Sequence, residues 1–187
     1  MVTRQQAHKI LYQLSRRSIS LAEFEQWLYQ TPELEDVLGQ EIYFSFLSRN
    51  YLEANALELV VEQVHSLIDL PRFEQERLVT LLQDVQCVSD DYFVQLKEIY
   101  ESYCEGYFFL RFIALSYITA GDEGVISVKR EDAQFLVWSA RIQREALRLL
   151  GFIERGKLGV TGFQEYTDLR KEEDRIEQNE IEGMFKH

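Results

Sequence analysis

The sequence predicts an all-α fold, a helical bundle with one small β-hairpin near the C-terminus. Three observations predict it. Apolar residues recur at helical spacing over long stretches, the 187 residues include only two prolines, and 46% of the residues are hydrophobic. A chain of this length buries roughly 70% of the surface of its unfolded form, so it can build a core without disulfides or metals.

The first two helices are predicted from an apolar face and a cap. A helix over residues 3–16 has one apolar face, made of Ala7, Ile10, Leu11 and Leu14. Ser20 and Glu23 have the spacing of a capping box, in which each residue satisfies a backbone N–H at the start of a helix. This pair predicts a second helix that ends near Tyr29.

Proline and glycine set the next boundaries. Thr31-Pro32 predicts the start of a third helix, and Gly39 its end. Residues 40–49 include IYFSFL, which alternates like a strand, but the helical neighbours favour a fourth helix. A longer helix is predicted over 52–70, with Pro71 ending it.

The middle of the chain predicts a long apolar helix at the centre of the fold. It follows a helix over 73–85. Ser89, with two aspartates after it, marks the new N-terminus, because acidic groups favour the positive end of the helix dipole. The helix is expected to run to Ala120, with a bend near Gly106.

The C-terminal third has a different character. Residues 121–124 (GDEG) predict a turn, and a helix follows from 128 or 129 to about 150. Residues 151–161 predict two short strands around an Arg155-Gly156 turn. A charged helix is then expected over 164–182.

Charge is distributed unevenly along the chain, whose formal net charge is −12. Up to Ile126 there are 9 Lys and Arg against 20 Asp and Glu, and from Ser127 onward 11 against 12. We therefore expect an acidic helical bundle over 1–121. Residues 125–187 would form a helix, a hairpin and a charged helix, either as a second domain or as part of the same one.

An acidic surface repels phosphate backbones and attracts basic partners. It also keeps a protein soluble without binding anything, so the charge alone does not decide between these interpretations.

Cys87 and Cys104 lie in apolar contexts and form no CxxC pair, which predicts buried thiols in a reducing, cytoplasmic setting. The most hydrophobic run, 107–120, is shorter than the ~20 residues that span a bilayer, and Arg111 interrupts it. We expect a buried helix there and no membrane association.

No catalytic motif is visible. His8, His65 and His187 lack a second ligand at metal-binding spacing, and the chain has neither a nucleophile-elbow nor a phosphate-binding glycine motif. Glu58 and Glu62 are four residues apart and could flank a metal, with Glu53 nearby, but a solvated helix face is the commoner meaning. The sequence predicts a non-enzyme with no cofactor and no metal.

One functional signal is the mixture of acidic and aromatic residues near the N-terminus. Aromatic rings supply binding energy at interfaces, and charges supply association rate and selectivity. We assign Phe24, Trp27 and Phe46 to the core. The candidate partner-binding residues are Tyr29, Glu33, Glu35, Asp36, Glu41, Tyr43, Tyr51 and Glu53.

The stretch SLAEFEQWLYQTPELEDVLGQEIYFSFLSRNY, residues 20–51, resembles the start of immunity-type proteins encoded beside bacterial polymorphic toxins. The shared pattern is EFE.WLY, an acidic ELE..LG and an aromatic-rich helix. The resemblance implies a cytoplasmic protein that binds and blocks a basic toxin or nuclease. The chain from about Asp69 onward shows no such resemblance.

A second signal lies in residues 141–166, where REALRLLGFIERGKLGVTGFQEY resembles the end of a winged-helix domain. This resemblance implies a regulator that binds DNA or another protein. The helix and wing would present Arg141, Arg144, Arg148, Arg155 and Lys157 to phosphates. Packing or partner contact is the alternative role, and the missing basic excess disfavours nucleic acid.

Overall fold

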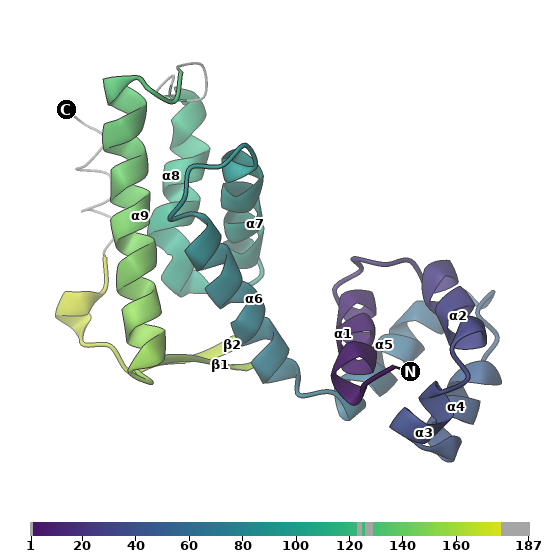
Figure 1. Ribbon diagram of the computed structural model, residues 1–187. Coiled ribbons are helices and arrows are strands. Elements are labelled where there is room, and N and C mark those ends of the chain that lie inside the picture. The colour runs from purple at the N-terminus through teal and green to yellow at the C-terminus, as the bar shows by residue number, and fades with distance from the viewer. Residues whose placement is uncertain (1, 123–124, 126–128, 177–187) are drawn as a thin grey trace. The chain divides into compact units, whose positions relative to one another are not determined.

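The computed structural model describes residues 2–122, 125 and 129–176. It is mostly helical with one small antiparallel hairpin, which confirms the predicted fold class (Figure 1). The chain divides into two compact units, Met1–Phe73 and Glu74–His187, and helix α6 spans the division.

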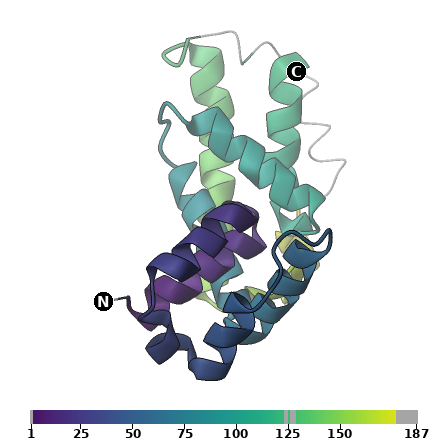
Figure 2. The ribbon, with the colours of Figure 1, turned by 90° about the vertical axis from the view of Figure 1, so that its right-hand side faces the viewer.

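The first unit contains five helices, shown from a second side in Figure 2. They are α1 (Arg4–Ser15), α2 (Leu21–Gln30), α3 (Leu34–Leu38), α4 (Gln40–Leu47) and α5 (Ala56–Leu67). The predicted capping box is present, since Glu23 N–H donates to Ser20 Oγ at 3.2 Å and Ser20 N–H to Glu23 Oε2 at 2.7 Å. Helix α4 confirms the helical interpretation of residues 40–49.

The core of the first unit forms where α1 packs on α5 and α2 packs on α4. Phe24 and Phe46 are fully buried, as predicted, with their rings edge to face and 5.5 Å apart. Trp27 is half-buried with its ring 5.8 Å from that of Phe24. The fully buried aliphatic positions include Leu11, Leu14, Leu28, Leu34, Val60 and Val64.

The second unit holds the remaining elements. They are α6 (Leu70–Asp84), α7 (Tyr92–Cys104), the 3-10 turn η1 (Phe108–Leu110), α8 (Arg111–Asp122), α9 (Ala133–Glu154), β1 (Leu158–Gly162), β2 (Glu165–Asp168) and η3 (Glu172–Asp174). Helix α8 packs on both α7 and α9, and the hairpin lies at the C-terminal end of α9 (Figure 1). Their shared core includes Leu82, Leu96, Ile113, Ile142 and Leu149.

Two predicted helix boundaries in the middle of the chain are wrong. Pro71 lies in the first turn of α6, where the missing N–H costs nothing, and α5 has already ended at Leu67. The long helix predicted from Ser89 to Ala120 is two helices. Gly106, at φ +120°, reverses the chain, so that α7 and α8 pack against each other.

The hairpin is displaced from its predicted place. Helix α9 starts after Asp132, whose side chain accepts a hydrogen bond from Gln134 N–H, and it runs on to Glu154. Arg155-Gly156 therefore ends this helix, with Gly156 at φ +64°, instead of turning a hairpin. The strands pair Leu158 with Asp168 and Val160 with Tyr166, around a turn between 162 and 165.

The charged helix predicted over 164–182 is also absent as far as Ile176, where β2 and η3 occupy the segment. Its remainder lies outside the described residues. Helix α8 continues through Asp122, so residues 121–122 are helical and do not belong to the predicted turn, and residues 123–124 are outside the described residues.

Helices α8 and α9 both belong to the second compact unit. They bury side chains in one core, as Ile113 of α8 and Ile142 of α9 illustrate. The hairpin region is thus continuous with α7 and α8, and the division falls between Phe73 and Glu74.

The run 107–120 forms η1 and most of α8, with Leu110, Ile113 and Ala114 fully buried, as expected for a core segment. None of the helices in the described part of the chain is long and apolar enough to cross a membrane. The cysteine prediction is wrong, because Cys87 and Cys104 are both exposed free thiols. Each follows or ends a helix, where the chain turns away from the core.

Candidate functional site

The first unit presents an acidic surface on α2 to α5. From Leu21 to Leu67 the sequence has nine Asp and Glu but a single basic residue, Arg49. Arg49 donates from Nη2 to Gln63 Oε1 at 2.8 Å. Of the predicted partner-binding acids, Glu35 is half-buried, and the four exposed ones are Glu33, Asp36, Glu41 and Glu53.

The three predicted surface tyrosines behave differently. Tyr29 is 61% exposed and is available to a partner. Tyr43 is buried, with its hydroxyl 3.5 Å from Leu28 O, so its predicted surface role fails because α4 turns it toward α2. Tyr51 is half-buried and donates from its hydroxyl to Phe46 O at 2.9 Å.

Tyr51 and Tyr29 lie near each other. Burial raises the pKa of Tyr51 well above its ordinary value; the charge of Arg49 lowers it in part, and the nearby Glu25 carboxylate and Tyr29 raise it. Three exposed apolar side chains of the same elements were missed by sequence reasoning, Phe44 at 49%, Leu52 at 96% and Leu59 at 40% exposed. Phe44 follows the buried Tyr43 directly, and on a helix adjacent residues point in directions about 100° apart, which could have indicated its exposure.

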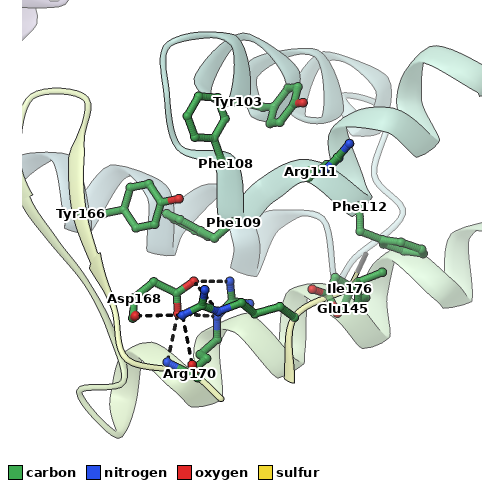
Figure 3. A pocket seen from close by; sticks show the side chains of 11 residues that line it. Tyr103, Phe108, Phe109, Arg111, Phe112, Glu145, Tyr166, Asp168, Arg170 and Ile176 are labelled. Atoms are coloured by element: carbon green, nitrogen blue, oxygen red, sulfur yellow. Dashed lines mark hydrogen bonds and ion pairs between the residues drawn. The ribbon is translucent and has the colours of Figure 1, made fainter. Parts of the chain in front are cut away.

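The second unit contains a cavity of about 230 Å³ between the start of α8 and the segment that follows the hairpin. Tyr103 and Phe108 lie on one side of it, and Asp168 and Arg170 on the other (Figure 3). Arg111 and Phe112 come from α8, Glu145 from α9 and Tyr166 from β2; Phe109, Arg175 and Ile176 complete the lining.

A second cavity, of about 350 Å³, adjoins the first. The two share Phe112, Glu145 and Ile176. The other lining residues of the second cavity are Arg141, Arg144 and Arg148, which lie on α9 at helical spacing. We call the two together the arginine-lined cavities.

Two ion pairs anchor these arginines. Arg148 donates to both oxygens of the buried Glu145, at 2.7 and 2.9 Å, and these hydrogen bonds raise the pKa of Arg148. The nearly buried Arg170 donates to both oxygens of Asp168, at 2.9 and 2.8 Å. Burial alone would raise the pKa of Asp168, but the hydrogen bonds and charge of Arg170, with the charge of Arg175, outweigh it and hold that pKa below its ordinary value.

The residues predicted from the winged-helix resemblance are thus separated. Arg141, Arg144 and Arg148 come together on α9. Arg155 and Lys157 lie at the base of the hairpin instead of its tip and line neither cavity, and the Arg155 guanidinium stacks 5.0 Å from the Phe152 ring centroid. Sequence reasoning missed Arg111, Arg170 and Arg175, which no short-range pattern connects to α9.

A buried polar network fixes the hairpin on α6. The Tyr107 hydroxyl lies 3.1 Å from Glu74 Oε2, to which it donates, and it accepts from Gln164 N–H at 3.1 Å. Arg77 Nη2 bonds the same Glu74 oxygen at 3.0 Å. Burial, and then the Glu74 carboxylate, raise the pKa of Tyr107 to about 12. Because the carboxylate is already held by Arg77 and Tyr107, we interpret this network as structural.

The described residues contain no group of three His, Cys, Asp or Glu side chains that could hold a metal ion. Glu53, Glu58 and Glu62, the carboxylates considered from the sequence, are each exposed to solvent. Comparison with protein-family models, with curated proteins and with solved structures gave no match to this chain.

Proposed function

We propose that this protein is a non-enzymatic binding protein whose first unit binds a basic protein partner. The observation that carries the proposal is the ninefold excess of acidic over basic residues on α2 to α5. Such a surface attracts a positively charged partner over a distance of about 10 Å at 0.1 M salt and speeds its association.

Exposed apolar groups on the same elements supply the second requirement of an interface. Charges on a rim give rate and selectivity, whereas buried aromatic anchors give most of the affinity. Tyr29, at 61% exposed, can bury its ring against a partner, and Leu52 and Phe44 are similarly available. These side chains interleave along the sequence with the exposed acids.

The specific form of the proposal is an immunity-type inhibitor of a toxin or nuclease. It is supported by the resemblance of residues 20–51, which form α2, α3 and α4 within the first unit. The enzymes that act on nucleic acid carry basic surfaces to hold phosphates, and an acidic surface can compete for those surfaces.

The test compares the full chain with a variant that carries Glu33→Gln, Glu41→Gln and Glu53→Gln. These changes keep side-chain size and remove three exposed charges, one from the residue before α3, one from α4 and one from the loop before α5. Both chains are immobilised and used to capture proteins from the source cell. We expect a basic protein that the wild type retains and the variant loses.

The matched control removes three exposed charges from the second unit, through Glu98→Gln, Glu131→Gln and Glu154→Gln. It should retain the partner. With the partner purified, the Glu33, Glu41 and Glu53 variant should associate at least tenfold more slowly at low salt, with a flatter salt dependence. Equal capture by both variants, or capture of an acidic protein only, would remove the proposal.

A further inference from the structure

The arginine-lined cavities have a charge opposite to that of the unit that contains them. Residues 74–187 include 14 Lys and Arg against 22 Asp and Glu, a formal net charge of −8. Among the described residues, the lining of the two cavities includes six arginines and two carboxylates, Glu145 and Asp168. The cavities therefore concentrate positive charge at one place on an acidic unit.

The geometry holds two of the six arginines, Arg148 and Arg170, in position. Glu145 and Asp168 each bind an arginine through both oxygens, with distances of 2.7 to 2.9 Å. Arg148 also donates to Asp174 O at 2.6 Å, which ties α9 to the segment after the hairpin. Arg148 and Arg170 are fixed in this way and therefore lose little conformational entropy when a ligand binds nearby.

Aromatic rings lie at the same cavities. Phe108 is 61% exposed, and Tyr103 supports it edge to face at 5.9 Å. The Tyr166 ring contacts Phe109 at 5.1 Å on another side of the lining, and Figure 3 shows both pairs around the cavity. A planar group can stack on such rings while an anionic group reaches the arginines.

We propose that the arginine-lined cavities bind a small molecule that combines an aromatic ring with phosphate, the chemistry of a nucleoside phosphate. The phosphate would lie toward Arg141 and Arg144 on α9, and the ring toward Phe108. Their combined size suits this class, since sites for small ligands measure about 300 to 1,000 Å³. This site is in the second unit and does not depend on the partner surface proposed for the first.

The experiment is calorimetric titration of the full chain with ADP, inorganic phosphate and adenosine. ADP should bind with saturation, and more tightly than either of its halves. Arg144→Ala removes an exposed cation and should weaken both ADP and phosphate about tenfold. Phe108→Ala should weaken ADP about tenfold through lost stacking and leave phosphate binding unchanged.

Lys97→Ala is the matched control, because Lys97 is an exposed cation of the same unit that lines neither cavity. It should leave ADP binding unchanged. All three substituted side chains are exposed, so thermal unfolding should show the variants folded. No saturable binding of ADP at millimolar concentration overturns the proposal, and so does binding that neither Arg144→Ala nor Phe108→Ala weakens.

A short DNA duplex provides the remaining comparison. If the duplex bound at low salt through Arg144 while ADP did not bind, the small-molecule assignment would be wrong and a nucleic-acid interface would replace it. A duplex that fails to compete with bound ADP supports the assignment.

Discussion

Replacing Tyr107 with Phe tests the buried network that holds the hairpin. The Tyr107 side chain is fully buried, and its hydroxyl bonds both Glu74 Oε2 and Gln164 N–H at 3.1 Å. Phenylalanine keeps the ring contacts with Phe109 and Tyr166. It leaves the buried Glu74 carboxylate, the Gln164 amide and the Gly162 carbonyl, which lies 3.3 Å from the hydroxyl, with one partner fewer each.

The magnitude follows from those two bonds. A hydrogen bond to a charged group contributes about 1.5–3 kcal/mol, and a neutral one about 1 kcal/mol. We expect Tyr107→Phe to lower the free energy of unfolding of the second unit by about 3 kcal/mol at pH 7. That is a large part of the 5–15 kcal/mol that is typical of a whole domain.

The pH dependence gives the effect a distinctive sign. The folded pKa of Tyr107 is raised to about 12 from an ordinary value of 10.0. Below pH 10 the hydroxyl is neutral in both states, and its full contribution is present. Between pH 10 and 12 only the unfolded state ionises, so the advantage of the wild type over Tyr107→Phe should fall by about 2–3 kcal/mol.

The two tryptophans make the measurement specific. Trp27 belongs to the first unit and Trp138 to the second. In a Trp27→Phe background, urea unfolding followed by fluorescence reports the second unit. Tyr166→Phe is the control, since the structure shows no hydrogen bond of its hydroxyl within the described residues, and it should change stability at pH 7 by less than about 0.5 kcal/mol. A loss below about 1 kcal/mol for Tyr107→Phe, or one that stays constant from pH 10 to 12, would refute the reasoning.

Three further predictions follow from local geometry. Gly106→Ala should cost more than about 1 kcal/mol in urea unfolding, because φ is +120° and the new Cβ would lie 3.4 Å from a backbone oxygen, whereas Gly159→Ala, at 3.7 Å from a flexible side chain, should cost less. Cys87 and Cys104 are exposed, so both should react with a thiol reagent in the native state, and protection of either until denaturant is added would contradict their placement. Ser20→Ala removes the cap of α2 and should lower the stability of the first unit by about 1 kcal/mol in thermal unfolding; an unchanged midpoint would show that the cap contributes nothing.

Local signals in the sequence predicted the helices best where a side-chain cap or a regular apolar face marks the same helix. The Ser20 and Glu23 pair marks the start of α2, and the apolar face of α1 recurs every three or four residues. These features depend on neighbours within one turn of helix, which a sequence displays directly.

The predicted boundaries of helices and strands were wrong where one residue is compatible with two local structures. Gly106 is compatible with a bend or a reversal, and the choice depends on whether α7 and α8 bury more surface against each other. Gly156 suits a hairpin turn and a helix end equally, since both need positive φ. Packing between segments distant in sequence decides such cases, and the local conformational propensity of one residue does not.

The candidate sites show the same limit in another form. Arg141, Arg144 and Arg148 share a helix and were found together from sequence, yet the other half of their surroundings comes from η1, α8 and the end of the hairpin. Tyr43 and Phe44 differ in exposure only because α4 turns one of them toward α2. The charged and aromatic residues of a sequence therefore include those of the sites, but the sequence does not show which of them come together or which are exposed.

Net charge is a poor guide to which ligands the chain binds. From −12 for the whole chain, sequence reasoning counted phosphate as a disfavoured partner. A charge acts over about 10 Å at 0.1 M salt, so a ligand in a cavity responds to the groups that line it and hardly to the acids on other faces. Among the described residues, the lining of the two cavities has six arginines and two carboxylates, although the surrounding unit has a negative net charge. The same short range applies to the acidic surface of the first unit. Its attraction for a basic partner should depend on Glu33, Glu41 and Glu53 more than on the total charge of the chain.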